Sequence, residues 1–268
     1  MSTRRNQPAS IGDEHGFTLI ELLVSMLVAT VITGAAFSFL IFTTEDVSHV
    51  SARVGVDQGG RVALQRIISE LNSGCYETNV HPVLAGSSPT TLVFESEGGE
   101  ASEFPTVEKH EIVYTKGSGT TEGTLVEKAY VSTGTKVEGG KNIREYSKTP
   151  THTTRLLTGI EQTKYGSEEA TAMFRYYRFY HEGDPPPQGQ STPAYGELDP
   201  TPITTPLTST EAEYATKVTV AFTLAPEGKE VVSFNHDRPV VLEDSALFRL
   251  EPSSEASTAK NLPCEKPA

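Results

Sequence analysis

Gly16-Phe17-Thr18-Leu19-Ile20-Glu21-Leu22-Leu23-Val24 opens an apolar run that continues to Phe42. Within residues 17–42 the only ionisable side chain is Glu21, whereas the chain as a whole is polar, with a mean hydropathy of -0.31. A helix rises about 1.5 Å per residue, so this run is long enough to cross the roughly 30 Å core of a bilayer. The sequence therefore predicts a transmembrane helix over residues 17–42.

The residues on either side of the run predict its orientation. Arg4 and Arg5 precede it, whereas Glu45 and Asp46 follow it, and no basic residue occurs again until Arg53. Basic residues resist translocation, so the N-terminus is expected in the cytoplasm and the rest of the chain beyond the membrane. The polar leader precedes the apolar run, unlike a secretory signal, in which an apolar core precedes a small-residue cleavage site.

The motif itself carries a family resemblance. Residues 16–21 resemble the processing and methylation motif of type IV prepilins and of the pseudopilins of type II secretion. The resemblance implies that a prepilin peptidase cleaves after Gly16, removing residues 1–16 as a leader, and methylates the new amine of Phe17. An aromatic strand, a loop and a strand ending near Leu250 precede a Cys-bearing tail, an order of features similar to that of the large minor pilins and J-type minor pseudopilins. The size of the chain also favours a minor pilin, since major pilins are usually smaller.

Glu21 is a carboxylate inside an apolar helix, a costly arrangement that is by default functional. The resemblance implies an assembly role, in which Glu21 neutralises the amine of Phe17 in a neighbouring subunit of a filament. The alternative is a carboxylate that reaches the membrane interface, since it lies only about one helical turn into the run.

Apolar residues at three- and four-residue spacing predict that the helix continues as an amphipathic segment over residues 43–74. They are Val47, Val50, Val54, Leu64, Ile67, Ile68 and Leu71. Gly55, Gly59 and Gly60 interrupt this pattern, and a bend or local break is expected there. Asn72-Ser73-Gly74 is a helix stop signal.

Beyond Cys75 the pattern changes to alternation, with β-branched and aromatic residues between turn-forming clusters. Predicted strands are Thr91–Glu95, Glu111–Thr115, Leu125–Val131, Met173–Tyr180, Lys217–Leu224 and Ala246–Leu250, with a helical turn over Glu211–Thr216. The expected fold is α+β, a long N-terminal helix whose outer half packs on an antiparallel β-sheet domain of residues 75–252. Residues 253–268 are expected to form a flexible tail.

Two further features lie in the predicted β-rich domain and its tail. The segment 183–206 is rich in proline and predicts an extended surface loop, either a plain connection or a projection that contacts a ligand. Cys75 and Cys264 both fall on the predicted outer side of the membrane, where a disulfide can form. Two free thiols too far apart to meet remain the alternative.

The composition and the motifs argue against several classes of function. The net charge of -13 argues against binding nucleic acid, which draws on basic clusters. The histidines are scattered, and His110-Glu111 is not followed by the second histidine of a metalloprotease, so no catalytic residue, metal site or cofactor is expected. Two acidic groups could in principle surround Ca²⁺, although solvated loops are favoured: Glu95, Glu97 and Glu100, and Asp184, Glu197 and Asp199.

The expected function is that of a non-enzymatic minor subunit of a type IV pilus or pseudopilus, a single-pass membrane protein before assembly. The resemblance implies three partners: other pilins through the N-terminal helix, the prepilin peptidase, and membrane lipid. Two alternatives from other classes remain, an adhesin or binding module displayed on a filament and an ordinary signal-anchored surface protein. The sequence alone does not separate pilus, secretion and DNA-uptake systems.

Overall fold

The computed structural model describes residues 18–74, 82–98, 106–118, 123–138, 141–163, 171–180, 184, 196–224 and 240–248. The chain divides into two compact units, Met1–Ser51 and Ala52–Ala268, which we describe separately. The leader 1–16, Phe17, both cysteines and the tail 253–268 lie outside the described residues. Cleavage, methylation and the Cys75–Cys264 disulfide therefore stay predictions.

The long helix is confirmed. Helix α1 covers Leu19–Asn72 and ends at the predicted stop signal, where the hydroxyl of Ser73 donates to the carbonyl of Glu70 at 2.8 Å. The predicted break at the glycines is wrong, because α1 continues as helix through Gly55, Gly59 and Gly60. Gly60 has a packing reason to be glycine: a Cβ built there would lie 2.2 Å from Leu224 Cδ1.

In the first unit the described part of α1 carries the membrane-length stretch. Leu19–Thr44 is the one described helical segment that is long and apolar enough to cross a membrane, judged by length and composition. Its large apolar side chains are exposed within the isolated chain, Leu19 by 79% and Phe39 by 70%. This surface is not covered by anything in the described part of its own chain.

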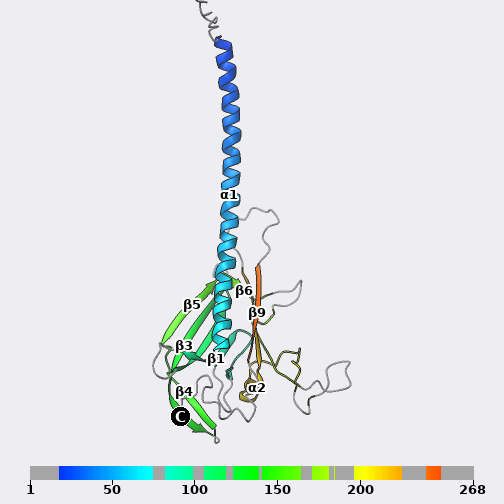
Figure 1. Cartoon of the computed structure of the whole chain (residues 1–268). Helices are drawn as coiled ribbons and strands as arrows, with labels where there is room; N and C mark the ends of the chain where they lie inside the picture. The colour runs from blue at the N-terminus through cyan, green and yellow to red at the C-terminus, as the bar shows by residue number, and fades with distance from the viewer. Residues whose placement is uncertain are drawn as a thin grey trace, which may run out of the picture. The chain divides into compact units, whose positions relative to one another are not determined.

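The second unit contains antiparallel β-structure, as predicted, but in two sheets instead of one (Figure 1). The first sheet has the order β1-β2-β3-β4, and β5 also pairs with β3. The bounds are β1 Thr91–Gly98, β2 Thr106–Thr115, β3 Thr124–Glu138, β4 Lys141–Tyr146 and β5 His152–Thr158. Strand β3 is long and pairs with different strands along its length. Its first half lies between β2 and β5, and its second half pairs with β4 after an irregularity at Ser132/Gly134.

The second sheet is built around β8 (Lys217–Leu224), which was predicted with these bounds. The sheet has the order β6-β8-β7, in which β6 (Ile160–Glu161) and β7 (Phe174–Tyr177) both pair with β8. Strand β9 (Val240–Leu247) also pairs with β8. Seven of the eight residues of β8 are buried, as befits a central strand. The predicted helical turn is helix α2, Ser209–Tyr214, which begins with a capping box between Thr208 and Glu211.

The core of the second unit joins the last turns of α1 to both sheets. Leu64, Ile67 and Leu71 of α1 are buried together with residues of the first sheet, such as Phe94 and Ile112, and with β8. Of the apolar positions that predicted an amphipathic continuation, Val47, Val50 and Val54 are exposed in contrast to these three. The last part of the proline-rich segment, residues 196–206, is held against β7 and Arg178 by backbone hydrogen bonds. Ile203 N–H donates to the carbonyl of Tyr176 at 2.7 Å, and Asp199 N–H donates to the carbonyl of Arg178 at 2.8 Å.

Candidate functional site

The first candidate site is the exposed apolar surface of α1 in the first unit. Within Leu19–Thr44 the hydroxyl side chains are satisfied by the helix itself, since each donates to a carbonyl one turn earlier. Thr33 Oγ1 donates to Ala29 at 2.7 Å and Thr30 Oγ1 to Met26 at 2.8 Å. Ser25 and Ser38 do the same at 2.9 and 3.0 Å. Because these hydroxyl groups donate to backbone carbonyls, they do not need water as a hydrogen-bond partner. The surface therefore suits contact with lipid or with another apolar helix.

Glu21 lies in the first turn of α1, and the hydroxyl of Thr18 accepts from its N–H at 3.4 Å. Its side chain is exposed, and among the described residues no cation is paired with its carboxylate. A carboxylate at the start of a helix also interacts favourably with the helix dipole. The geometry thus leaves the charge of Glu21 available to a group outside the described chain. Gly16 and Phe17 are not described, so the structure does not place them beside Glu21.

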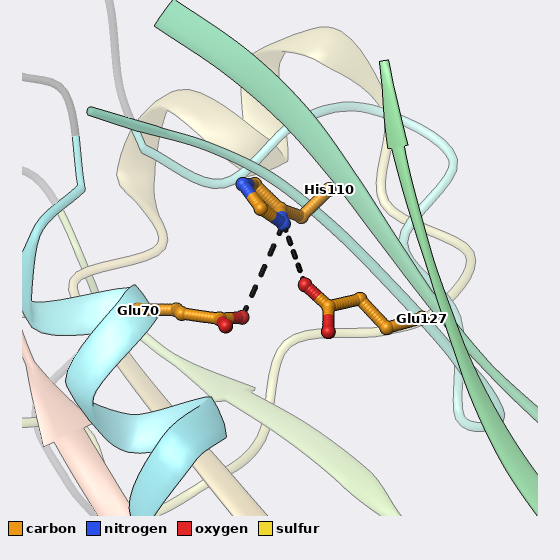
Figure 2. Close-up of side chains that lie close together, drawn as sticks. All are labelled: Glu70, His110 and Glu127. Atoms are coloured by element: carbon orange, nitrogen blue, oxygen red, sulfur yellow. Dashed lines mark hydrogen bonds and ion pairs between the residues drawn. The ribbon is translucent and has the colours of Figure 1, made fainter. Parts of the chain in front are cut away.

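A second cluster lies in the other unit, where three elements bring together Glu70, His110 and Glu127 (Figure 2). Glu70 is on the last turns of α1, His110 is on β2 and Glu127 is on β3. The β2–β3 register pairs His110 with Ala129 and Ile112 with Glu127. His110 and Glu127 are therefore diagonal neighbours on one face of the sheet, the spacing at which long side chains meet.

The cluster is held by a chain of charged contacts. His110 Nδ1 lies 2.8 Å from Glu127 Oε1 and 4.0 Å from Glu70 Oε2. Arg66, one turn before Glu70, links the two carboxylates: its Nε lies 2.9 Å from Glu70 Oε1 and its Nη2 2.8 Å from Glu127 Oε2. The side chains of His110 and Glu127 are 9% and 4% exposed. Within the described chain, Glu70 Oε2 and His110 Nε2 are buried without a hydrogen-bond partner.

The surroundings shift the pKa values of Glu70 and Glu127 in opposite directions. Burial, with the neighbouring charge of Glu127, raises the pKa of Glu70 above its ordinary value despite the contact with Arg66. Burial also acts to raise the pKa of Glu127, but the hydrogen bond with His110 and the charge of Arg66 outweigh it and leave that pKa lowered. Two close carboxyl groups that share one guanidinium split in this way because both cannot ionise freely.

The sequence did not predict this cluster, because its members are separated in sequence and come from a helix and two strands. The one local signal is Arg66 and Glu70 at helical i, i+4 spacing. Two of the acidic residues that the sequence singled out are paired with cations, and Asp199 accepts hydrogen bonds from the Tyr180 hydroxyl and the Thr201 N–H. Glu95 Oε2 lies 3.1 Å from Arg144 Nη1, and Asp184 Oδ1 lies 3.2 Å from Arg178 Nη2, while Glu100 is outside the described residues.

Comparison with known proteins identifies the N-terminal segment. Residues 12–37 match the family described as the prokaryotic N-terminal methylation motif. This motif marks type IV pilin and pseudopilin proteins, so the resemblance seen in residues 16–21 is confirmed. Neither the curated proteins nor the solved structures contain a match to the chain. The motif and the apolar helix support a pilin-like or pseudopilin-like subunit that is inserted in a membrane.

Proposed function

We propose that the chain is a structural minor subunit of a type IV pilus or pseudopilus and not an enzyme. The observation that carries the proposal is the methylation motif at residues 12–37, which overlaps the exposed apolar stretch Leu19–Thr44. A helix of that kind can be stored in a membrane and later packed against the same helix of other subunits. The second unit has its own core and would be carried on the outer surface of such a filament.

The proposed maturation follows from the motif. A prepilin peptidase cleaves after Gly16 and methylates the amine of Phe17, while the N-terminus lies in the cytoplasm and the second unit beyond the membrane. The asymmetry of Arg4 and Arg5 against Glu45 and Asp46 supports this orientation. Before assembly the protein is a single-pass membrane protein in contact with lipid, and its later partners are other pilins or pseudopilins.

Mass spectrometry of the mature protein tests the proposal. In cells that express a prepilin peptidase, the N-terminal peptide is expected to begin at Phe17 and to carry one added methyl group. Gly16→Leu places a bulky side chain at the cleavage position and should leave the precursor uncut. Gly34→Ala is the matched control, because Gly34 lies in the same apolar segment with no described atom close to its added Cβ.

Two results would contradict this proposal. One is an intact leader on the wild-type chain in the presence of active peptidase, which would indicate an ordinary signal-anchored protein. The other is normal cleavage of Gly16→Leu. Co-purification of the processed chain with sheared filaments, at low abundance relative to the main subunit, would separately support the minor-subunit role.

A further inference from the structure

Arg66 orients both carboxylates of the buried cluster. It contacts one oxygen of each, Glu70 Oε1 and Glu127 Oε2, at 2.9 and 2.8 Å. The other oxygen of each carboxylate therefore faces His110 Nδ1, at 4.0 Å from Glu70 Oε2 and 2.8 Å from Glu127 Oε1. One donor atom from each of Glu70, His110 and Glu127 thus converges, all within 4.8 Å of one another.

The donors are fixed in place by packing. The ring of Phe94, itself fully buried, stacks on the His110 imidazole with centroids 5.1 Å apart and planes inclined by 18°. Glu127 is 4% exposed, and Glu70 Oε2 is a buried oxygen with no hydrogen-bond partner in the described chain. Buried polar atoms normally have a partner, so this oxygen, 4.0 Å from His110 Nδ1, has room to accept a cation between them.

The balance of charge around the cluster points the same way. A third carboxylate, Glu108, lies on the far side of the imidazole, with Oε2 3.9 Å from His110 Nε2. Arg66 contacts two of these three acidic groups, Glu70 and Glu127. A divalent ion would offset negative charge that a single guanidinium leaves uncompensated, which favours it in a buried site.

We propose that Glu70 Oε2, Glu127 Oε1 and His110 Nδ1 bind a divalent transition-metal ion of the Zn²⁺ class. One imidazole nitrogen with two carboxylate oxygens suits Zn²⁺ and its first-row neighbours better than Ca²⁺ or Mg²⁺, which prefer oxygen alone. Three donors about 2.0–2.2 Å from a tetrahedral ion lie about 3.3–3.6 Å apart. Binding would therefore draw Glu70 Oε2 closer to His110 Nδ1 than its present 4.0 Å and separate Nδ1 from Glu127 Oε1, now 2.8 Å away. Water completes the coordination.

An ion bound at Nδ1 would require the ring to carry its one proton on Nε2, which lies 3.9 Å from Glu108 Oε2. Arg66 and Glu108 then hold the ligands from outside, as the partners of metal-bound carboxylates and histidines commonly do. The ion would tie the last turns of α1 to β2 and β3. This role is independent of processing and filament entry.

Calorimetric titration of Zn²⁺ into the purified full-length chain, stripped of metal and held in mild detergent, tests the site. We expect one ion per chain with a micromolar or lower Kd, and weaker binding at acidic pH because protons compete for the ligands. Co²⁺ at the same site should give visible d–d absorption without a thiolate charge-transfer band. That spectrum distinguishes the site from one built on Cys75 and Cys264.

Zn²⁺ affinities of variants with a substituted ligand test whether the ion binds at this cluster. Glu70→Gln keeps the size of the side chain and its contact with Arg66, and should weaken binding at least tenfold, as should His110→Gln. His152→Gln is the matched control, since this histidine is exposed on β5, and it should bind like wild type. Far-UV circular dichroism confirms that each variant is folded. The proposal is overturned by three results: no Zn²⁺ binding to folded wild type, unchanged affinity in folded Glu70→Gln, or a thiolate band with Co²⁺.

Discussion

Tyr176 is fully buried on β7, and its hydroxyl is a polar group that the core has to satisfy. The hydroxyl lies 3.1 Å from the carbonyl of Ser88 and 3.0 Å from that of Thr91, so it ties the second sheet to the start of β1. Burial, the dominant influence, raises the pKa of the Tyr176 phenol well above its ordinary value. A single side chain thus links the two sheets through packing and through a hydrogen bond.

Tyr176→Phe removes the donor and leaves two carbonyls without it. We expect the free energy of unfolding to fall by about 1–3 kcal/mol, the usual cost of a buried group that loses its partner. Tyr177→Phe is the control, since Tyr177 is next to it but only partly buried, and should change the stability by less than about 0.5 kcal/mol. Denaturant unfolding followed by near-ultraviolet circular dichroism measures both. Equal losses in the two variants would rule out the hydrogen bond as the cause.

The same residue predicts a pH dependence with a defined sign. A raised pKa means that the folded state holds the phenolic proton more tightly than the unfolded state, in which tyrosine titrates near pH 10. The contribution of Tyr176 is therefore fully present below about pH 10 and is lost as pH rises beyond it. Tyr176→Phe should show a shallower loss of stability in alkaline solution than wild type, in parallel denaturant titrations.

At the scale of elements, α1 has two different surfaces. Up to Phe42 its apolar side chains are exposed, whereas Leu64, Ile67 and Leu71 are buried in the core of the second unit. Three glycines lie between these stretches, and they are not equivalent. A Cβ at Gly55 or Gly59 meets no atom within 4 Å, but at Gly60 it would lie 2.2 Å from Leu224 Cδ1 and 2.7 Å from Leu242 Cδ1.

Gly60 and Gly59 make a matched pair for a test of this packing. Gly60→Ala forces the nearly fully buried Leu224 to move and should lower the free energy of unfolding by about 1–2 kcal/mol, as overpacking outweighs the gain in helix propensity. Gly59→Ala meets no neighbour and should raise it by up to about 1 kcal/mol. Thermal unfolding in detergent compares the two. Stabilisation by both substitutions would show that α1 does not approach β8 and β9 this closely.

The elements that could be predicted from the sequence are those with a strong apolar pattern. The helix, its stop at Asn72 and strand β8 follow from periodicity and are confirmed. Strand β4, Lys141-Asn142-Ile143-Arg144-Glu145-Tyr146, lacks such a pattern because it pairs only with the far half of β3 and leaves Ile143 exposed. The cluster of Glu70, His110 and Glu127 depends on strand register and on how the helix packs, neither of which is encoded locally.

At the scale of the whole molecule, the two units have different requirements of their surroundings. The second unit has a core of its own, in which large side chains from both sheets are fully buried. The apolar part of α1 in the first unit has no described cover from its own chain, so it needs lipid or the helices of other subunits. Under the proposed function, this stretch would exchange lipid for the helices of other subunits when the chain enters a filament.

Glu21 is the residue for which that exchange matters most. Glu21→Val removes a charge that is costly in a membrane, so insertion should be preserved or improved, and folding of the second unit should not change. In a filament the same substitution would leave the Phe17 amine of a neighbouring subunit without its partner. A buried charge stripped of its partner costs about 3–5 kcal/mol, enough to exclude a subunit from assembly.

The expected phenotype is a chain that is cleaved, folded and retained in the membrane but absent from sheared filaments. Quantitative immunoblotting of membrane and filament fractions measures the distribution. Glu21→Gln keeps the size and polarity of the side chain without its charge and should be excluded like Glu21→Val, which separates a need for charge from a need for polarity. If Glu21→Val enters filaments as well as wild type, the carboxylate does not pair with the amine, and its place in the apolar helix is then explained by its exposure near the membrane interface.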